Sequence, residues 1–339
     1  MRIFLLGLAM ISAGCVAART SGIDADEGVG SRVHVMRQAG DWSAVFVLDR
    51  DAPVWGFAHS AQMRDGKPQW RPEQWSVETP GVVLDRFGTR DLLRSVDGGP
   101  VPRIVRIRIK PASARVEASY SPALMFSDGS VALFSGQFDV FPATSVEAVR
   151  ETQDDMNGAI PAAPPTIVTW SDGGAPVLYR GMLERDPSSR GGDTYVLFGK
   201  ARLVEYESLA AVVDPVMPDW IQRTIVEFAP QVTDYYARRL GVVLEHRPMV
   251  MASWNGPTPR MTSMGGSVLP GLIVATFEGE DVVVETDGLR SMVRWFIGHE
   301  CAHFWLGQTV RYETERDFWI TEGGADMTAI RGMAQLDLS

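Results

Sequence analysis

Cysteine is scarce in this chain. Only two cysteines occur among 339 residues, Cys15 near the N-terminus and Cys301 near the C-terminus. So few cysteines, one of them in a predicted signal segment, exclude a disulfide framework as the source of stability. A chain of this length with 45% hydrophobic residues has ample material for an apolar core and predicts about two domains.

Basic residues are fewer than acidic residues. The chain carries 32 Lys and Arg residues against 42 Asp and Glu residues, which gives a net charge of −10. Proteins that bind nucleic acid usually present a basic patch or stripe, so we expect no nucleic-acid partner. The composition leaves the oligomeric state open.

The apolar run at the N-terminus is too short to span a bilayer. It extends from Ile3 to Ala13 after a basic start, which predicts a secretory signal within residues 1–22. The residues Ser12-Ala13-Gly14-Cys15 resemble a bacterial lipoprotein cleavage box, in which Cys15 would carry a lipid anchor. Cleavage after Ala17 or Ala18 would instead release a soluble protein. We therefore expect an exported protein, in the periplasm or lipid-anchored to a bacterial envelope, with membrane contact only through that anchor.

Residues 23–213 are predicted to form a β-rich domain, an antiparallel sandwich or saddle. Apolar and charged residues alternate over 105–110, apolar runs occupy 131–134 and 194–198, and glycine-containing turns separate these segments. The tryptophans in this region are predicted to pack in the core rather than to bind a ligand: Trp42, Trp55, Trp70 and Trp75.

A zinc-site signature lies near the C-terminus, His299-Glu300-Cys301-Ala302-His303. Apolar residues at helical spacing precede it and predict a helix that Asp287 could cap and Gly307 could end. Two imidazoles four residues apart on a helix share one face and can share one ion, while Glu300 is offset by one position and can touch water beside that ion. An amphipathic helix with two core-facing histidines would show the same pentapeptide. Cys301 points away from the shared face, which predicts a packed thiol.

Glu322 is the candidate third ligand, because a catalytic zinc site uses three protein ligands and leaves a fourth position for water. It begins a second predicted helix, from Thr321 to about Leu336, which Thr321 could cap. Asp326 lies one turn further on the same face. Its carboxylate could accept the outer N–H of a ligand histidine and fix the orientation of that ring. Residues 214–339 are thus predicted to form a domain that holds one Zn²⁺ ion.

The residues around these ligands resemble the aminopeptidase N-like family of zinc peptidases, the gluzincins. That family reads H-E-x-x-H-x-W-F-G-N and then W-L-N-E-G, with eighteen residues between the second histidine and the Glu. Here His303-Phe304-Trp305-Leu306-Gly307-Gln308 and Trp319-Ile320-Thr321-Glu322-Gly323 occupy these places with the same gap. The resemblance implies an α+β chain in which a thermolysin-like zinc domain follows the β-rich domain.

A second resemblance lies upstream, where Gly265, Gly266, Ser267 and Val268 occupy the place of the family's G-A/G-M-E-N-P segment. In the family this segment is an edge strand that lies against bound peptide, and its Glu grips the free amino group of the substrate. The resemblance implies that these four residues bind substrate. Val268 stands at the Glu position, and an apolar side chain cannot pair with an ammonium group.

Two further family features do not appear in this sequence. Family members carry a Tyr beyond the Glu ligand, which stabilises the oxyanion of the tetrahedral intermediate, and a helical domain that closes the cleft. No Tyr follows Glu322. The sequence therefore predicts either a truncated zinc domain or a diverged relative. Tyr235, Tyr236 and Tyr312 lie upstream and are predicted to pack.

The function expected from these features is zinc-dependent hydrolysis of peptides or proteins outside the cytoplasm, with Glu300 as the general base. With Val268 at the anchor position, the protein could act as an endopeptidase or as an atypical exopeptidase. The alternative is an envelope lipoprotein in which the zinc site is structural and the β-rich domain binds a partner.

Overall fold

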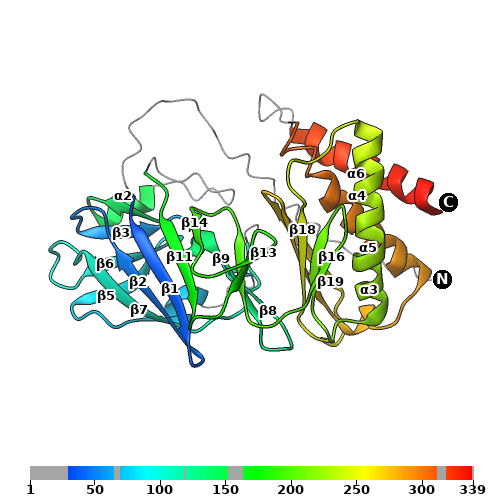
Figure 1. Ribbon diagram of the computed structural model, residues 1–339. Coiled ribbons are helices and arrows are strands. Elements are labelled where there is room, and N and C mark those ends of the chain that lie inside the picture. Colours follow the sequence, from blue (N-terminus) through cyan, green and yellow to red (C-terminus); the bar gives the residue numbers. More distant parts are fainter. Residues whose placement is uncertain (1–29, 65–68, 118–119, 152–162, 311–317, 338–339) are drawn as a thin grey trace.

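The computed structural model describes residues 30–64, 69–117, 120–151, 163–310 and 318–337. It has a mixed α+β fold, as predicted. Strands fill the N-terminal half, and in the C-terminal half helices cover one face of a sheet (Figure 1). Within these ranges no helix combines the length and the apolar character of a membrane span. The predicted signal segment and Cys15 lie outside the described residues.

Two sheets form the first part of the N-terminal half. A six-stranded sheet has the order β14 (Ser188–Arg190), β11 (Ile167–Asp172), β1 (Arg32–Gln38), β2 (Asp41–Val47), β7 (Ile104–Ile109) and β4 (Trp75–Val77). A four-stranded sheet has the order β10 (Val140–Ala143), β3 (Val54–Phe57), β6 (Arg90–Ser95) and β5 (Val82–Phe87). Strand β7 follows the predicted alternation, since every second residue is buried. The strand pairs of these two sheets are antiparallel, as predicted, except that β1 pairs with β11 in parallel.

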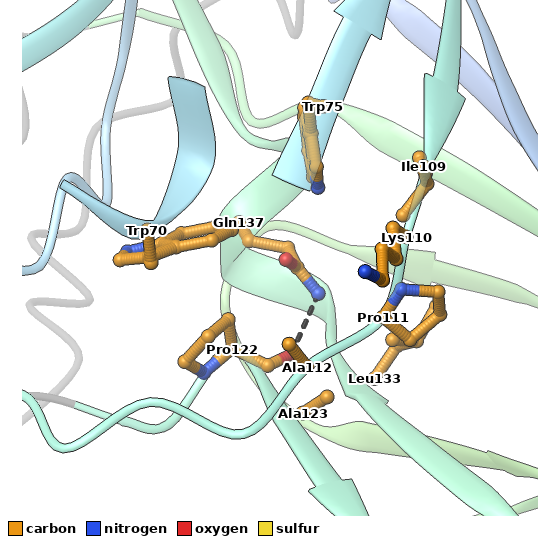
Figure 2. A pocket seen from close by; sticks show the side chains of 10 residues that line it. All are labelled: Trp70, Trp75, Ile109, Lys110, Pro111, Ala112, Pro122, Ala123, Leu133 and Gln137. Atoms are coloured by element: carbon orange, nitrogen blue, oxygen red, sulfur yellow. Dashed lines mark hydrogen bonds between the residues drawn. The ribbon is translucent and has the colours of Figure 1, made fainter. Parts of the chain in front are cut away.

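The predicted packing role of the tryptophans is confirmed. Trp42, Trp55, Trp70 and Trp75 are all at most 8% exposed, and all four belong to one apolar cluster. Figure 2 shows the pocket beside Trp70 and Trp75, in which the side-chain amide of Gln137 donates to the Pro122 carbonyl at 2.7 Å. Apolar side chains and prolines form most of the wall, and none of the predicted site residues lines it. Helices α1 (Trp70–Gln74) and α2 (Val146–Glu151) are short.

A third sheet joins the two halves. Its order is β13 (Met182–Glu184), β12 (Val177–Tyr179), β15 (Tyr195–Phe198), β9 (Val131–Phe134) and β8 (Ala123–Met125), and the 3₁₀ turn η2 (Ser135–Phe138) follows β9. The predicted strands at 131–134 and 194–198 are β9 and β15. Apolar side chains of this sheet pack against one face of a fourth sheet, so the two halves share a buried apolar layer.

The fourth sheet is mixed and carries the helices on its other face. Its order is β16 (Leu203–Glu205), β17 (Ala210–Val213), β18 (Met249–Trp254), β20 (Leu272–Glu278) and β19 (Ser263–Leu269). Strands β17, β18 and β20 are parallel neighbours, whereas β19 pairs antiparallel with β20 at the edge. Since β16 and β17 precede residue 214, this sheet draws on both sides of the predicted domain boundary.

Five helical segments cover that face. They are α3 (Asp219–Arg223), the π-helical turn η3 (Thr224–Phe228), α4 (Ala229–Leu240), α5 (Asp287–Ala302) and α6 (Phe318–Asp337), and the 3₁₀ turn η4 (Glu280–Val282) precedes α5. The π-helical turn η3 interrupts the helical run and ends two residues before Pro230. Proline has no N–H to donate and its ring crowds the preceding turn, which accounts for the change in helical period there.

Candidate metal centre

Helix α5 carries His299 and Glu300, and His303 stands at its C-terminal cap position. The helix begins one residue after Thr286, whose hydroxyl accepts the backbone N–H of Leu289 at 3.2 Å. The prediction that Asp287 caps this helix was therefore wrong, since Asp287 is its first residue. The prediction that Gly307 ends it was also wrong, because the helix ends at Ala302 and tight turns follow. His303 keeps helical backbone angles, with φ −66° and ψ −17°, so both rings still share one face.

Helix α6 carries Glu322 and Asp326, and it packs against α5 through small residues. A Cβ on Gly298 of α5 would lie 3.4 Å from the Cβ of Ala329, in ordinary contact. Ala325 and Ala329 are fully buried at this crossing. The small side chains let the two helix backbones approach closely, which brings the carboxylate of Glu322 within reach of the histidines. Thr321 lies inside α6 and is buried, so the prediction that it caps the helix was wrong.

The three predicted ligands converge. One nitrogen of His299, one of His303 and one carboxylate oxygen of Glu322 all lie within 4.8 Å of one another. The two Nε2 atoms are 3.0 Å apart, and the Glu322 oxygens lie 3.4 Å from His299 Nε2 and 3.8 Å from His303 Nε2. Ligand atoms at about 2.0–2.2 Å from a tetrahedral zinc ion lie roughly 3.3–3.5 Å from each other. The spacing of these three side chains fits one such ion.

The outer nitrogen of each imidazole has its own partner. His299 Nδ1 donates to Asp326 Oδ1 at 2.9 Å, which is the contact predicted for Asp326, and His303 Nδ1 donates to the Leu306 carbonyl at 3.2 Å. A carbonyl can only accept, so the proton of neutral His303 stands on Nδ1 and leaves a lone pair on Nε2. The same holds for His299 beside the Asp326 carboxylate. Two Nε2 lone pairs that face each other at 3.0 Å repel unless a metal ion or a proton lies between them.

The carboxylate of Glu322 supplies a second observation that fits a metal. Its Oε1 atom is buried and has no hydrogen-bond partner among the described residues. A buried carboxylate oxygen without a donor is costly, and a metal ion would satisfy it. Two imidazole nitrogens and one carboxylate oxygen are also a typical donor set for a zinc ion.

The Glu300 carboxyl group is buried beside the candidate ligands. Burial raises the pKa of Glu300 to about 7; the charge of His299 opposes this rise and the charge of Glu322 adds to it. Burial also lowers the pKa of His303. For His299, burial acts in the same direction, but its contacts with Glu322, Glu300 and Asp326 outweigh burial and raise the pKa. Three carboxyl groups therefore surround the two imidazoles, an arrangement that attracts a cation.

The predicted substrate segment forms edge strand β19, directly beside Glu300. A Cβ on Gly266 would lie 3.1 Å from Cδ of Glu300, so this glycine faces the Glu300 carboxyl group. Val268 is 5% exposed and belongs to the apolar cluster under the helices, and Ser267 is 8% exposed. The Val268 side chain is therefore packed inside the protein, and main-chain atoms of β19 are what this part of the strand can offer to a ligand.

We predict that Asp326→Asn weakens zinc binding by about 10–100-fold, because loss of the outer carboxylate loosens the orientation of His299 and lowers its basicity. Competition with a fluorescent chelator would measure the zinc affinity. Asp337→Asn is the matched control, since Asp337 lies on the same helix but pairs with Arg294 at the surface. Equal zinc affinity in the two variants would contradict the role of Asp326.

Gly266→Ala is expected to lower the free energy of unfolding by about 1–3 kcal/mol, because the new methyl group would overpack the core. It would lie 2.5 Å from Cζ of Phe296, a ring that is buried between α5 and β19. Gly265→Ala is the control, since its methyl group would meet only the Thr276 hydroxyl at 3.1 Å. Denaturant unfolding would compare them; equal losses would contradict the close approach of β19 to α5.

Three site contacts were not predicted from the sequence. Leu306 holds His303 through its carbonyl, Gln308 donates to the Leu269 carbonyl at 2.8 Å, and Tyr120 donates to the Val268 carbonyl at 3.2 Å. The contacts of Gln308 and Tyr120 join residues 39 and 148 positions apart, and no local pattern marks such pairs. Tyr236 donates to the Gly298 carbonyl at 3.0 Å and is a packing residue, and Tyr312 lies outside the described residues.

Comparison with known proteins shows a likeness in structure alone. Neither protein-family models nor curated protein sequences match this chain. An aminopeptidase N family protein from Idiomarina loihiensis is similar in structure, with a TM-score of 0.52 and 11% identity over 87% of this chain and 53% of that one. The native yeast LTA4 hydrolase gives a TM-score of 0.44 and 12% identity over 91% of this chain and 48% of that one.

The chain spans about half the length of both of these structures. A TM-score below 0.5 does not establish a shared fold, so only the bacterial protein bears on the architecture. At 11% identity, the comparison with the aminopeptidase N family protein shows a shared fold and nothing more.

Proposed function

We propose that this protein is a zinc-dependent peptidase in which His299, His303 and Glu322 hold one zinc ion and Glu300 is the general base. The observation that carries the proposal is the convergence of the three ligands, with the lone pairs of both histidines directed at one point. Glu300 follows His299 on the same helix and faces the edge strand. A metal site that only stabilised the fold would not require a buried, unligated carboxyl group beside it.

A zinc ion bound by these ligands would supply Lewis-acid chemistry, which polarises a peptide carbonyl and acidifies a water molecule. The residues of the chain have the remaining tasks. A carboxylate oxygen of Glu300 takes a proton from the attacking water. Glu300 then passes this proton to the leaving amine when the C–N bond breaks. Asp326 and the Leu306 carbonyl keep protons on the two Nδ1 atoms, so that both Nε2 atoms stay free to bind the metal.

A peptide substrate is supported by the edge strand and by the structural comparison. Among the described residues no strand pairs with the outer edge of β19, which lies beside Glu300 at Gly266, and an extended peptide can add to such an edge through main-chain hydrogen bonds. The similar bacterial structure is described as an aminopeptidase N family protein. We further propose that the C-terminal half is thermolysin-like and that the protein acts outside the cytoplasm, the latter on the signal pattern of residues 1–22.

A peptide-library digest followed by mass spectrometry tests this function. We expect cleavage by the zinc-loaded protein, loss of cleavage with a chelator, and recovery when zinc is added back. Zinc binding that raises the melting temperature without any zinc-dependent cleavage would contradict the peptidase and would support the alternative of a structural zinc module.

A further inference from the structure

The free edge of β19 is open over Gly266 and covered over Val268. Leu269 pairs with Leu272 across a two-residue turn, and the alternation of an antiparallel ladder then directs the main-chain groups of Met264, Gly266 and Val268 away from β20. At Gly266 this edge lies beside Glu300. At Val268, two residues or about 7 Å further along the strand, the outward carbonyl accepts the hydroxyl of Tyr120.

Tyr120 comes from the N-terminal half and is held there by other aromatic residues. Its ring lies 4.8 Å from that of buried Phe134, which in turn lies 5.3 Å from fully buried Tyr195. The Tyr195 hydroxyl donates to the carbonyl of Ser121 at 2.6 Å and so fixes the backbone next to Tyr120. A ring braced in this way resists displacement by an incoming strand.

We propose that Tyr120 is a specificity-determining residue that limits how far a bound peptide can extend along the edge of β19. This inference rests on the proposed peptidase function. A peptide that adds antiparallel to β19, as β20 does on the other side, has the residues that precede the cleaved bond directed toward Val268. Tyr120 occupies the main-chain acceptor that such a peptide would need there. If the residue just before the cleaved bond pairs with Gly266, the third residue before that bond would need the carbonyl of Val268. A bound peptide can therefore have no more than two residues before the cleaved bond.

The proposed limit on substrate length is steric and does not depend on an ion pair with the substrate. Val268 is apolar and packed among core residues, so this position of β19 offers no carboxylate to a peptide ammonium group. A steric limit needs no such group, because a longer peptide would have to move the Tyr120 ring and lose its bond to the Val268 carbonyl. Peptides with a blocked N-terminus are then accepted as well as free ones of the same length.

The test uses internally quenched peptides built around the bond cut most often in the library digest, with one to four residues before it. For the wild type, kcat/KM is expected to fall at least about tenfold between two and three residues. Tyr120→Ala should remove this fall, and Tyr120→Phe, which keeps the ring, should preserve it. Fluorescence anisotropy with the zinc-loaded Glu300→Gln protein should show the same length limit in binding.

Three results would overturn the proposed role of Tyr120. Efficient cleavage of the four-residue peptide by the wild type overturns the proposed limit without any variant. An unchanged length profile in Tyr120→Ala, with zinc content and melting temperature like those of the wild type, also overturns it. If no protein of the series cleaves any peptide in the presence of zinc, the proposed function itself fails, and the proposed limit fails with it.

Discussion

Glu300→Gln is expected to bind zinc like the wild type and to cleave peptides about 10²–10⁴ times more slowly, the range that a positioned general base contributes. Glutamine has nearly the shape of glutamate and keeps the packing beside Gly266, but its amide cannot take a proton from water. The rate loss should therefore appear mainly in kcat. Steady-state kinetics with the peptide cut most often in the library digest, together with zinc analysis of the same samples, would measure both quantities.

Glu285→Gln is the matched control for this experiment. Glu285 precedes α5 and pairs with Arg290 at 2.9 Å and with Arg223 at 3.8 Å, so its loss removes two partly exposed ion pairs. We expect wild-type cleavage from this variant. Unchanged cleavage in Glu300→Gln, or a rate loss of the same size in both variants, would contradict the role of Glu300.

Glu322→Gln is expected to weaken zinc binding by more than the roughly 10–100-fold that loss of an outer partner causes, because the substitution removes the one anionic ligand. The effect should also appear in stability. Zinc at 100 times its Kd stabilises a folded protein by about 2.7 kcal/mol. At that zinc concentration Glu322→Gln should gain less than about 0.5 kcal/mol, which thermal unfolding with and without zinc would show.

The stability of the metal-free form separates this effect from misfolding. Without zinc, Glu322→Gln should be about as stable as the wild type, because the buried Oε1 atom has no hydrogen-bond partner among the described residues. Equal zinc-induced stabilisation in wild type and variant would contradict ligation by Glu322. The Asp337→Asn protein again serves as the control on the same helix.

The local part of the site could be predicted from the sequence. A four-residue spacing on a helix determines that His299 and His303 share a face, and the apolar repeat ahead of them marks the helix itself. Helix ends were harder to predict. Thr286 and Asp287 are both good N-cap residues, and only the observed bond from the Leu289 N–H to the Thr286 hydroxyl decides between them.

The rest of the site depends on contacts that a local pattern cannot reveal. Strands β16 and β17 precede the predicted boundary, yet they pair with β18, because sheet membership follows from packing across the whole chain. The close crossing of α5 and α6 depends on Gly298 meeting Ala329, two small residues that look unremarkable in sequence. Tyr120 meets β19 only because the third and fourth sheets share a buried layer.

The position of the metal in crystals of the zinc-loaded protein would show whether His299, His303 and Glu322 are its ligands. An anomalous difference map should show one peak per chain, about 2.0–2.2 Å from His299 Nε2, His303 Nε2 and a carboxylate oxygen of Glu322. The Glu300 carboxylate should lie outside the ligand shell, next to the open position. A full zinc equivalent bound elsewhere, or a peak that lacks Glu322 as a ligand, would contradict the account.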